Sequence, residues 1–132
     1  MAKILLADDN AIIRRIFRRV LAERPEWEVC AEASNGVEAL AMVKRHRPDV
    51  AVLDLSMPLM SGVQAAKEII AACPNTLLVA ESMHEISHLR GALKSLGVKA
   101  FVPKMRMVID LLPAIEAVLG GGTWFQDVAT TH

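Results

Sequence analysis

The stretch ILLADDN, residues 4–10, joins a run of aliphatic residues to two adjacent aspartates, Asp8 and Asp9. Continuous aliphatic runs are typical of strands that are covered on both faces, as in a parallel sheet. Two neighbouring carboxylates repel each other and resist joint ionisation. A bound cation would remove that cost, so the stretch predicts a buried strand that ends at a cation site.

Four further apolar runs follow at fairly even intervals, and segments with helical spacing separate them. Strands that alternate with helices indicate βαβ units and a parallel sheet. The run at 27–33 alternates apolar and polar residues, which predicts an edge strand with one wetter face. The five predicted strands are KILLA (3–7), WEVCAEA (27–33), DVAVLD (49–54), TLLVAE (76–81) and KAFV (99–102).

The predicted helices begin at recognisable capping residues. Asn10 precedes the first helix, and Asn35 and Ser61 are each followed three residues later by Glu or Gln, as in a capping box. Proline is tolerated only in the first turn of a helix, so Pro113 predicts a short last helix with Asp110 as its cap. In the first helix, the residues expected to form the buried stripe are Ile13, Ile16, Phe17 and Val20.

The composition indicates one aliphatic domain without a strong attraction to charged polymers. The 132 residues are 53% hydrophobic and 4% aromatic, and 15 basic residues balance 15 acidic ones. We therefore expect no direct contact with nucleic acid. No apolar run approaches the length of a membrane span, and the N-terminus meets acidic residues too soon for a signal peptide. Cys30 and Cys73 have no metal-binding or redox spacing, so we expect reduced thiols in a soluble, cytoplasmic protein.

Polar residues follow four of the predicted strands, at the end where open parallel sheets bind ligands. Asp8 and Asp9 follow the first strand and Asp54 ends the third, so neighbouring strands would bring three carboxylates together around Mg²⁺. Ser82 and Lys104 follow the fourth and fifth strands and offer a hydroxyl and an ammonium group to a phosphoryl group. This set suits phosphoryl transfer onto an aspartate.

The same segments carry a family resemblance over roughly residues 2–120. LLADDN (5–10), ASNGVEAL (33–40), DLSMPLMSG (54–62) and GVKAFVPK (97–104) resemble the receiver domain of two-component response regulators. The resemblance implies a CheY-like (βα)₅ three-layer sandwich with strand order 2-1-3-4-5. The spacings from Asp54 to Ser82 and from Ser82 to Lys104 look most like receivers that precede a LuxR-type helix-turn-helix. Residues 1–120 would then form the receiver domain, and 121–132 a tail or the start of a linker to an effector domain.

The resemblance implies a role for each metal-binding position. Asp54 would be the phosphoacceptor, and it would bind Mg²⁺ together with Asp9 and the backbone carbonyl of Ser56. Asp8 would act on the metal through a water molecule.

The resemblance also implies which residues contact the phosphoryl group and which residue changes conformation in response. Ser82 and Lys104 would hold the phosphoryl group, and Phe101 would be the aromatic switch that turns inward. Glu81 stands where this subgroup usually has an apolar residue. A one-residue slip of the strand would place Glu81 in the site, where it would repel phosphate.

The resemblance implies a histidine kinase as partner, and it allows self-association on phosphorylation. The first helix borders the predicted acidic site and carries a basic run that suits kinase docking, formed by Arg14, Arg15, Arg18 and Arg19. The output expected is regulation of transcription through an effector domain, and the alternative is a stand-alone receiver acting by protein contacts. Such a domain catalyses only its own phosphorylation and dephosphorylation.

Two other readings of the sequence are weaker. A Mg²⁺-dependent phosphohydrolase that forms an aspartyl phosphate usually has an acid two residues after its nucleophile, but Ser56 stands there, and the chain leaves no room for a cap segment. His84 and His88 have the i, i+4 spacing of a zinc pair, but no third ligand stands nearby in the sequence.

Overall fold

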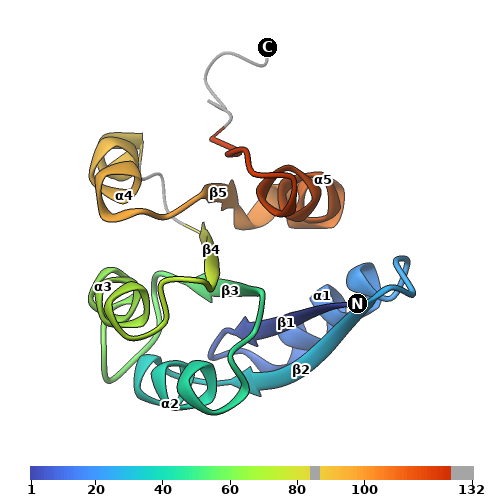
Figure 1. Cartoon of the computed structure of the whole chain (residues 1–132), viewed down its shortest axis with the longest axis horizontal. Coiled ribbons are helices and arrows are strands. Elements are labelled where there is room, and N and C mark those ends of the chain that lie inside the picture. The colour runs from blue at the N-terminus through green and yellow to red at the C-terminus, as the bar shows by residue number, and fades with distance from the viewer. Residues whose placement is uncertain (84–86, 126–132) are drawn as a thin grey trace.

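The computed structural model describes residues 1–83 and 87–125, and it contains a five-stranded parallel sheet of order β2-β1-β3-β4-β5 (Figure 1). The fold class and strand order predicted from the sequence are confirmed. Each strand lies within one residue of its predicted bounds, and β2 is at the edge of the sheet as predicted. The strands are β1 (Ala2–Ala7), β2 (Trp27–Ala33), β3 (Val50–Asp54), β4 (Leu77–Ser82) and β5 (Ala100–Pro103).

Helices cover both faces of the sheet, α1 and α5 on one side and α2, α3 and α4 on the other (Figure 1). Two short 3₁₀ segments, η1 (Ser87–Leu89) and η2 (Lys104–Arg106), lead into α4 and α5. The helices are α1 (Ala11–Leu21), α2 (Gly36–His46), α3 (Gly62–Ala72), α4 (Arg90–Leu96) and α5 (Met107–Leu119). Among the described residues, no helix is both long and apolar enough to cross a membrane.

The two faces of the sheet have separate aliphatic cores, and the alternation of side chains along the strands assigns residues to them. Leu6 of β1, Val52 of β3 and Val79 of β4 belong to the core under α1 and α5. Because side chains two residues apart share a face, Asp8, Asp54 and Glu81 continue the three strands on that same face. The fold thus directs three acids to one side of the sheet.

The predicted N-caps of α1, α2 and α3 are present. The side chain of Asn10 accepts hydrogen bonds from the backbone N–H groups of Ile12 and Ile13. The side chains of Asn35 and Ser61 each accept one hydrogen bond, from the backbone N–H group three residues later. The reciprocal half of the capping box differs in α2, because Glu38 accepts from the backbone N–H and hydroxyl of Ser34. These caps fix the starts of three helices next to the loops that follow the strands.

The prediction for the last helix is wrong. α5 begins at Met107, with Arg106 at the cap position, and Pro113 lies inside it. An interior proline removes one backbone hydrogen bond and costs about 3 kcal/mol. Burial of an apolar face against the sheet outweighs that cost, and the apolar residues buried along α5 are Met107, Leu111, Leu112, Ala114, Ile115 and Val118.

The predicted stripe of α1 is wrong at one position. Phe17, Val20 and Leu21 are buried and Ile13 is partly buried, but Ile16 is 39% exposed. A stripe of three buried residues at i, i+3 and i+4 is narrow, and it places Ile16 on the flank. The sequence HEISHLRGALKSLG, residues 84–97, also has helical spacing; there the structure describes η1 and α4, and residues 84–86 lie outside the described part.

The chain beyond α5 returns to the sheet. The N–H of Trp124 donates to the carbonyl oxygen of Lys99 at 3.0 Å, and the carbonyl oxygen of Trp124 accepts from the N–H of Phe101 at 2.9 Å. Phe125 packs against the core under α4, and its ring lies 5.0 Å from Nζ of Lys94. Residues 123–125 therefore cover the outer edge of β5.

Candidate functional site

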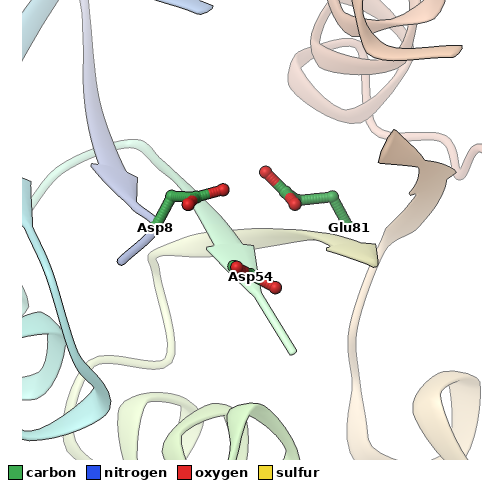
Figure 2. A group of neighbouring side chains, drawn as sticks. All are labelled: Asp8, Asp54 and Glu81. Carbon is green, nitrogen blue, oxygen red and sulfur yellow. The ribbon is translucent and has the colours of Figure 1, made fainter. Parts of the chain in front are cut away.

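Three buried carboxyl groups meet at the carboxyl ends of β1, β3 and β4. Asp8, Asp54 and Glu81 each offer one oxygen, and these atoms all lie within 4.8 Å of one another. Figure 2 shows Asp8 and Glu81 reaching toward each other from β1 and β4, with Asp54 at the end of β3 between the two strands. All three residues are at most 1% exposed. The structure therefore brings together two predicted acids and Glu81, which the sequence interpretation brought into the site only through a slip of the strand.

Lys104 supplies the positive charge at this cluster. Its Nζ lies 2.9 Å from Oδ2 of Asp8, 3.1 Å from Oδ2 of Asp54 and 3.2 Å from Oε1 of Glu81. Lys104 opens η2 directly after β5, so the strand end aims its side chain across β4 at the acids. A lysine ammonium has three N–H donors, and three carboxyl groups surround this one.

Burial and mutual repulsion change the proton affinities of the cluster. Burial, together with the charges of Asp8 and Asp54, raises the pKa of Glu81 to about 9, although the nearby ammonium opposes the rise. Burial also raises the pKa of Asp54, and the N–H of Ser56 opposes that rise. Burial alone would lower the pKa of Lys104, but the ion pairs with Glu81, Asp8 and Asp54 raise it. Lys104 is therefore charged at every physiological pH.

Asp9 lies at the mouth of the site rather than in the buried cluster. It is exposed and lines a pocket of about 590 Å³ together with Asn10, Met83 and Lys104. The pocket runs along the start of α1, where Ile12 and Ile13 form its apolar wall. A ligand in this pocket would contact Asp9 and Lys104 together.

The loop after β3 is tightly folded around Asp54. The N–H of Ser56 donates to Oδ1 of Asp54 at 2.9 Å, and the N–H of Gly62 donates to the carbonyl oxygen of Leu55 at 3.2 Å. A Cβ atom on Gly62 would lie 2.2 Å from Cα of Leu55, which is a clash. Only glycine fits at the start of α3, so this loop is held in one conformation beside Asp54.

Ser82 and Phe101 lie on the other face of the sheet from the acids. Ser82 is the buried last residue of β4 and pairs in register with Pro103 of β5. Phe101 is 7% exposed and belongs to the core under α2, α3 and α4. Its ring is therefore inside the molecule in this conformation.

The sequence interpretation assigned the hydroxyl to Ser82 and expected Glu81 to enter the site only through a one-residue slip of the strand, but the structure places Glu81 in the buried cluster. No slip of β4 is needed, because Asp54 pairs with Glu81 in register and Ser82 still ends the strand. The alternation of Val79 and Glu81 on the face of Val52 and Asp54 was the available signal.

The oxygen donors of the cluster fit a hard divalent cation. Oδ2 of Asp8 is buried, and it contacts the ammonium group of Lys104 at 2.9 Å. Carboxylate and carbonyl oxygens are the ligands that Mg²⁺ prefers, and it keeps several waters. Asp8, Asp54 and, at the open side, Asp9 could hold such an ion next to the pocket.

The basic run of α1 is divided between internal ion pairs and the surface. Arg14 and Arg18 both bind the carboxylate of Glu32 on β2, and Arg14 also donates to the carbonyl oxygen of Asp8. Arg15 and Arg19 are exposed. Two of the four arginines thus help to fix α1 against the site. Of the predicted histidine pair, His84 lies outside the described residues.

Comparisons with known proteins agree with this geometry. The family model of the response regulator receiver domain matches residues 4–116. Oxygen regulatory protein NreC of Staphylococcus epidermidis is 38% identical over 131 residues, which are 98% of this chain and 60% of that protein. Transcriptional regulatory protein DegU of Brevibacillus brevis is 30% identical over 129 residues, 97% of this chain and 54% of that protein.

A solved structure extends the agreement to three dimensions. The crystal structure of a LuxR-family two-component response regulator from Aurantimonas sp. SI85-9A1 superposes with a TM-score of 0.88 at 31% identity, covering 94% of this chain and 89% of that one. The chain belongs to the response regulator receiver domain family, and its relatives are of the LuxR and NarL type. It spans less than two thirds of the length of the curated relatives NreC and DegU.

Proposed function

We propose that Asp54 accepts a phosphoryl group from a histidine kinase and that the domain then switches its contacts with partners. The observation that carries the proposal is the position of Lys104 Nζ, 3.1 Å from Oδ2 of Asp54 and beside a second aspartate, Asp8. A carboxylate nucleophile with an ammonium group and oxygen ligands for a cation is the set that phosphoryl transfer onto an acid requires.

In the proposed step, an oxygen of Asp54 forms a bond to phosphorus while the bond from phosphorus to the kinase histidine breaks. The imidazole nitrogen keeps the electron pair of the broken bond. Bound Mg²⁺ would neutralise negative charge on the phosphoryl oxygens and the carboxylates. Lys104 and Ser82 would donate to the phosphoryl oxygens, and the N–H of Ser56 holds the other oxygen of Asp54 in place.

The pocket beside Asp9 supports approach of the kinase from α1. It opens between the first turn of α1 and Lys104, and the exposed Arg15 and Arg19 lie further along the same helix. The free thiols of Cys30 and Cys73 support the cytoplasm as the compartment. In this proposal the domain acts only on its own aspartyl phosphate.

We further propose that phosphorylation changes self-association and, through an effector domain, transcription. The relatives NreC and DegU are named regulatory proteins, which supports the transcriptional output. Met105, Val108 and Ile109 are more than 60% exposed at η2 and the start of α5, and they offer an apolar surface for a partner or a second copy. A stand-alone receiver is the alternative, and the reading frame after His132 distinguishes the two.

The test is the substitution Asp54→Asn. We expect labelling by a radioactive small-molecule phosphodonor, with Mg²⁺ present, to fall to background because the amide is a poor nucleophile. Asp49→Asn is the matched control, since Asp49 accepts from the N–H of Lys3 at the opposite end of the sheet. Labelling that persists in folded Asp54→Asn, or that is lost equally in the control, would contradict the proposal.

A further inference from the structure

Glu81 is the member of the site that the phosphoryl-transfer chemistry does not use. It is fully buried at the end of β4, and its carboxyl group is directed at Asp8 and the end of β3 (Figure 2). Its Oε1 contacts Nζ of Lys104, while Oε2 has no hydrogen-bond partner among the described residues. A buried polar atom without a partner costs about 1–3 kcal/mol, so this carboxyl group has a strong preference for any available donor.

The hydrogen-bond donor beside Glu81 is the ammonium group of Lys104, which a phosphoryl oxygen on Asp54 would also need. Lys104 has three N–H bonds, and one oxygen of each of Asp8, Asp54 and Glu81 lies within 3.2 Å of its Nζ. A phosphoryl group on Asp54 must therefore displace one of these acids from the ammonium group or share it.

Two of the three acids have another role when the site is loaded. Asp54 becomes the acyl phosphate, and Asp8 faces the proposed cation. Glu81 has neither role, and its backbone is fixed, because its carbonyl oxygen accepts from the N–H of Leu55 at 2.9 Å. Glu81 thus keeps its contact with Lys104 while the other two acids exchange partners.

We propose that Glu81 is a positioning residue that competes with the phosphoryl group for Lys104 and so limits the affinity of the site for that group. The inference rests on the proposed function, and it deepens it by naming a residue that tunes the phosphorylated state. An oxygen of a carboxylate and an oxygen of a neutral carboxyl group both accept from an ammonium group, so the competition exists in either form.

The test compares Glu81→Met and Glu81→Gln with the wild-type chain. Methionine fills a similar volume without an oxygen, whereas glutamine keeps one acceptor. With Mg²⁺ present, we expect the affinity for the phosphoryl analogue BeF₃⁻ to rise about 10-fold in Glu81→Met, which is what loss of one hydrogen bond to a charged group gives. Glu81→Gln should lie between the two, and Glu28→Met, on the exposed side of β2, should equal wild type.

A double-mutant cycle separates competition from a general change in the fold. In a Lys104→Met background, Glu81→Met should leave BeF₃⁻ affinity unchanged, because no ammonium group remains to compete for. Circular dichroism verifies that each variant is folded. An affinity in Glu81→Met that equals or falls below wild type, or an equal gain without Lys104, would overturn the inference.

The ammonium group itself gives a readout that needs no phosphoryl analogue. We expect the Nζ hydrogens of Lys104, followed by nitrogen NMR without BeF₃⁻, to exchange with water faster in Glu81→Met than in wild type. Unchanged exchange would overturn the inference. A wild-type chain that fails to bind BeF₃⁻ would instead contradict the proposed function, so the two failures are distinguishable.

Discussion

At the scale of single residues, Glu81 and Lys104 decide the charge of the buried site. Two aspartates facing one ammonium group would leave one net negative charge for a cation, and a third carboxyl group adds either a negative charge or a proton. Burial favours the proton, which is why the pKa of Glu81 rises. The protonation state of Glu81 therefore adds or removes one negative charge beside Lys104.

The backbone of Gly62 lies so close to Leu55 that there is no room for a side chain at this position. Gly62→Ala would place Cβ 2.2 Å from Cα of Leu55 and 2.9 Å from the carbonyl oxygen of Asp54. We expect the free energy of unfolding to fall by about 1–3 kcal/mol, as in other overpacked positions, and Mg²⁺ affinity to fall with it. Urea denaturation and a Mg²⁺ titration measure the two effects.

Gly91→Ala is the matched control for Gly62→Ala. Nothing lies within 4 Å of a Cβ built on Gly91, which is inside α4. Alanine there should raise the free energy of unfolding by about 0.5–1 kcal/mol, because it favours the helix over the unfolded chain. If both variants shift stability in the same direction, the close approach at Gly62 is not what fixes the loop.

At the scale of elements, the sequence predicted strands better than helix ends. Four of the strands are short apolar runs between turn signals, and β2 alternates apolar with polar residues, so all five are recognisable from the local sequence. The predicted start of α5 was wrong because it relied on the local backbone preference of Pro113. The helix begins earlier because Leu111 and Ile115 pack on the sheet, and that packing involves residues distant in sequence. The position of Glu81 in the cluster likewise depends on Asp8, Asp54 and Lys104, which are distant from it in sequence.

Residues 123–125 cover the edge of β5 through the backbone hydrogen bonds of Trp124. Trp124→Pro removes the N–H that donates to Lys99, and it should weaken the strap formed by 123–125. We expect the free energy of unfolding to fall by about 1–2 kcal/mol, the size of one lost backbone hydrogen bond and the packing that goes with it. Hydrogen exchange of the Phe101 amide, which donates to Trp124, should accelerate in parallel.

Trp124→Phe is the control for Trp124→Pro, because it keeps both backbone hydrogen bonds and most of the apolar contact. Its Phe101 amide should exchange at nearly the wild-type rate. Equal exchange in wild type and Trp124→Pro would mean that this strap does not protect the edge of β5.

At the scale of the whole molecule, acids from three strands meet around one ammonium group, which offsets only part of their negative charge. The chain has equal numbers of basic and acidic residues, so the field at the site is local rather than a property of the net charge. A ligand that binds the folded chain alone stabilises it in proportion to the logarithm of its concentration.

Mg²⁺ should therefore raise the melting temperature of the intact domain. At a concentration 100 times its dissociation constant, the gain in the free energy of unfolding is about 2.7 kcal/mol, which is several degrees for a domain of this size. Chelation should reverse the shift, and Asp9→Asn should reduce it, because Asp9 stands at the mouth of the pocket. An equal shift with Na⁺ at matched ionic strength would assign the effect to screening instead.

The two edge strands of the sheet, β2 and β5, are protected from pairing with other chains in different ways. β2 has no strand beyond it, and its pairing with β1 shifts register between Ile4 and Leu5, opposite Val29 and Ala31, so that Cys30 is skipped. Such an irregularity bends the strand and spoils the regular row of amide groups that a foreign chain would need for a template. We therefore expect the uncovered flank of β2 to pair poorly with a strand from a second chain.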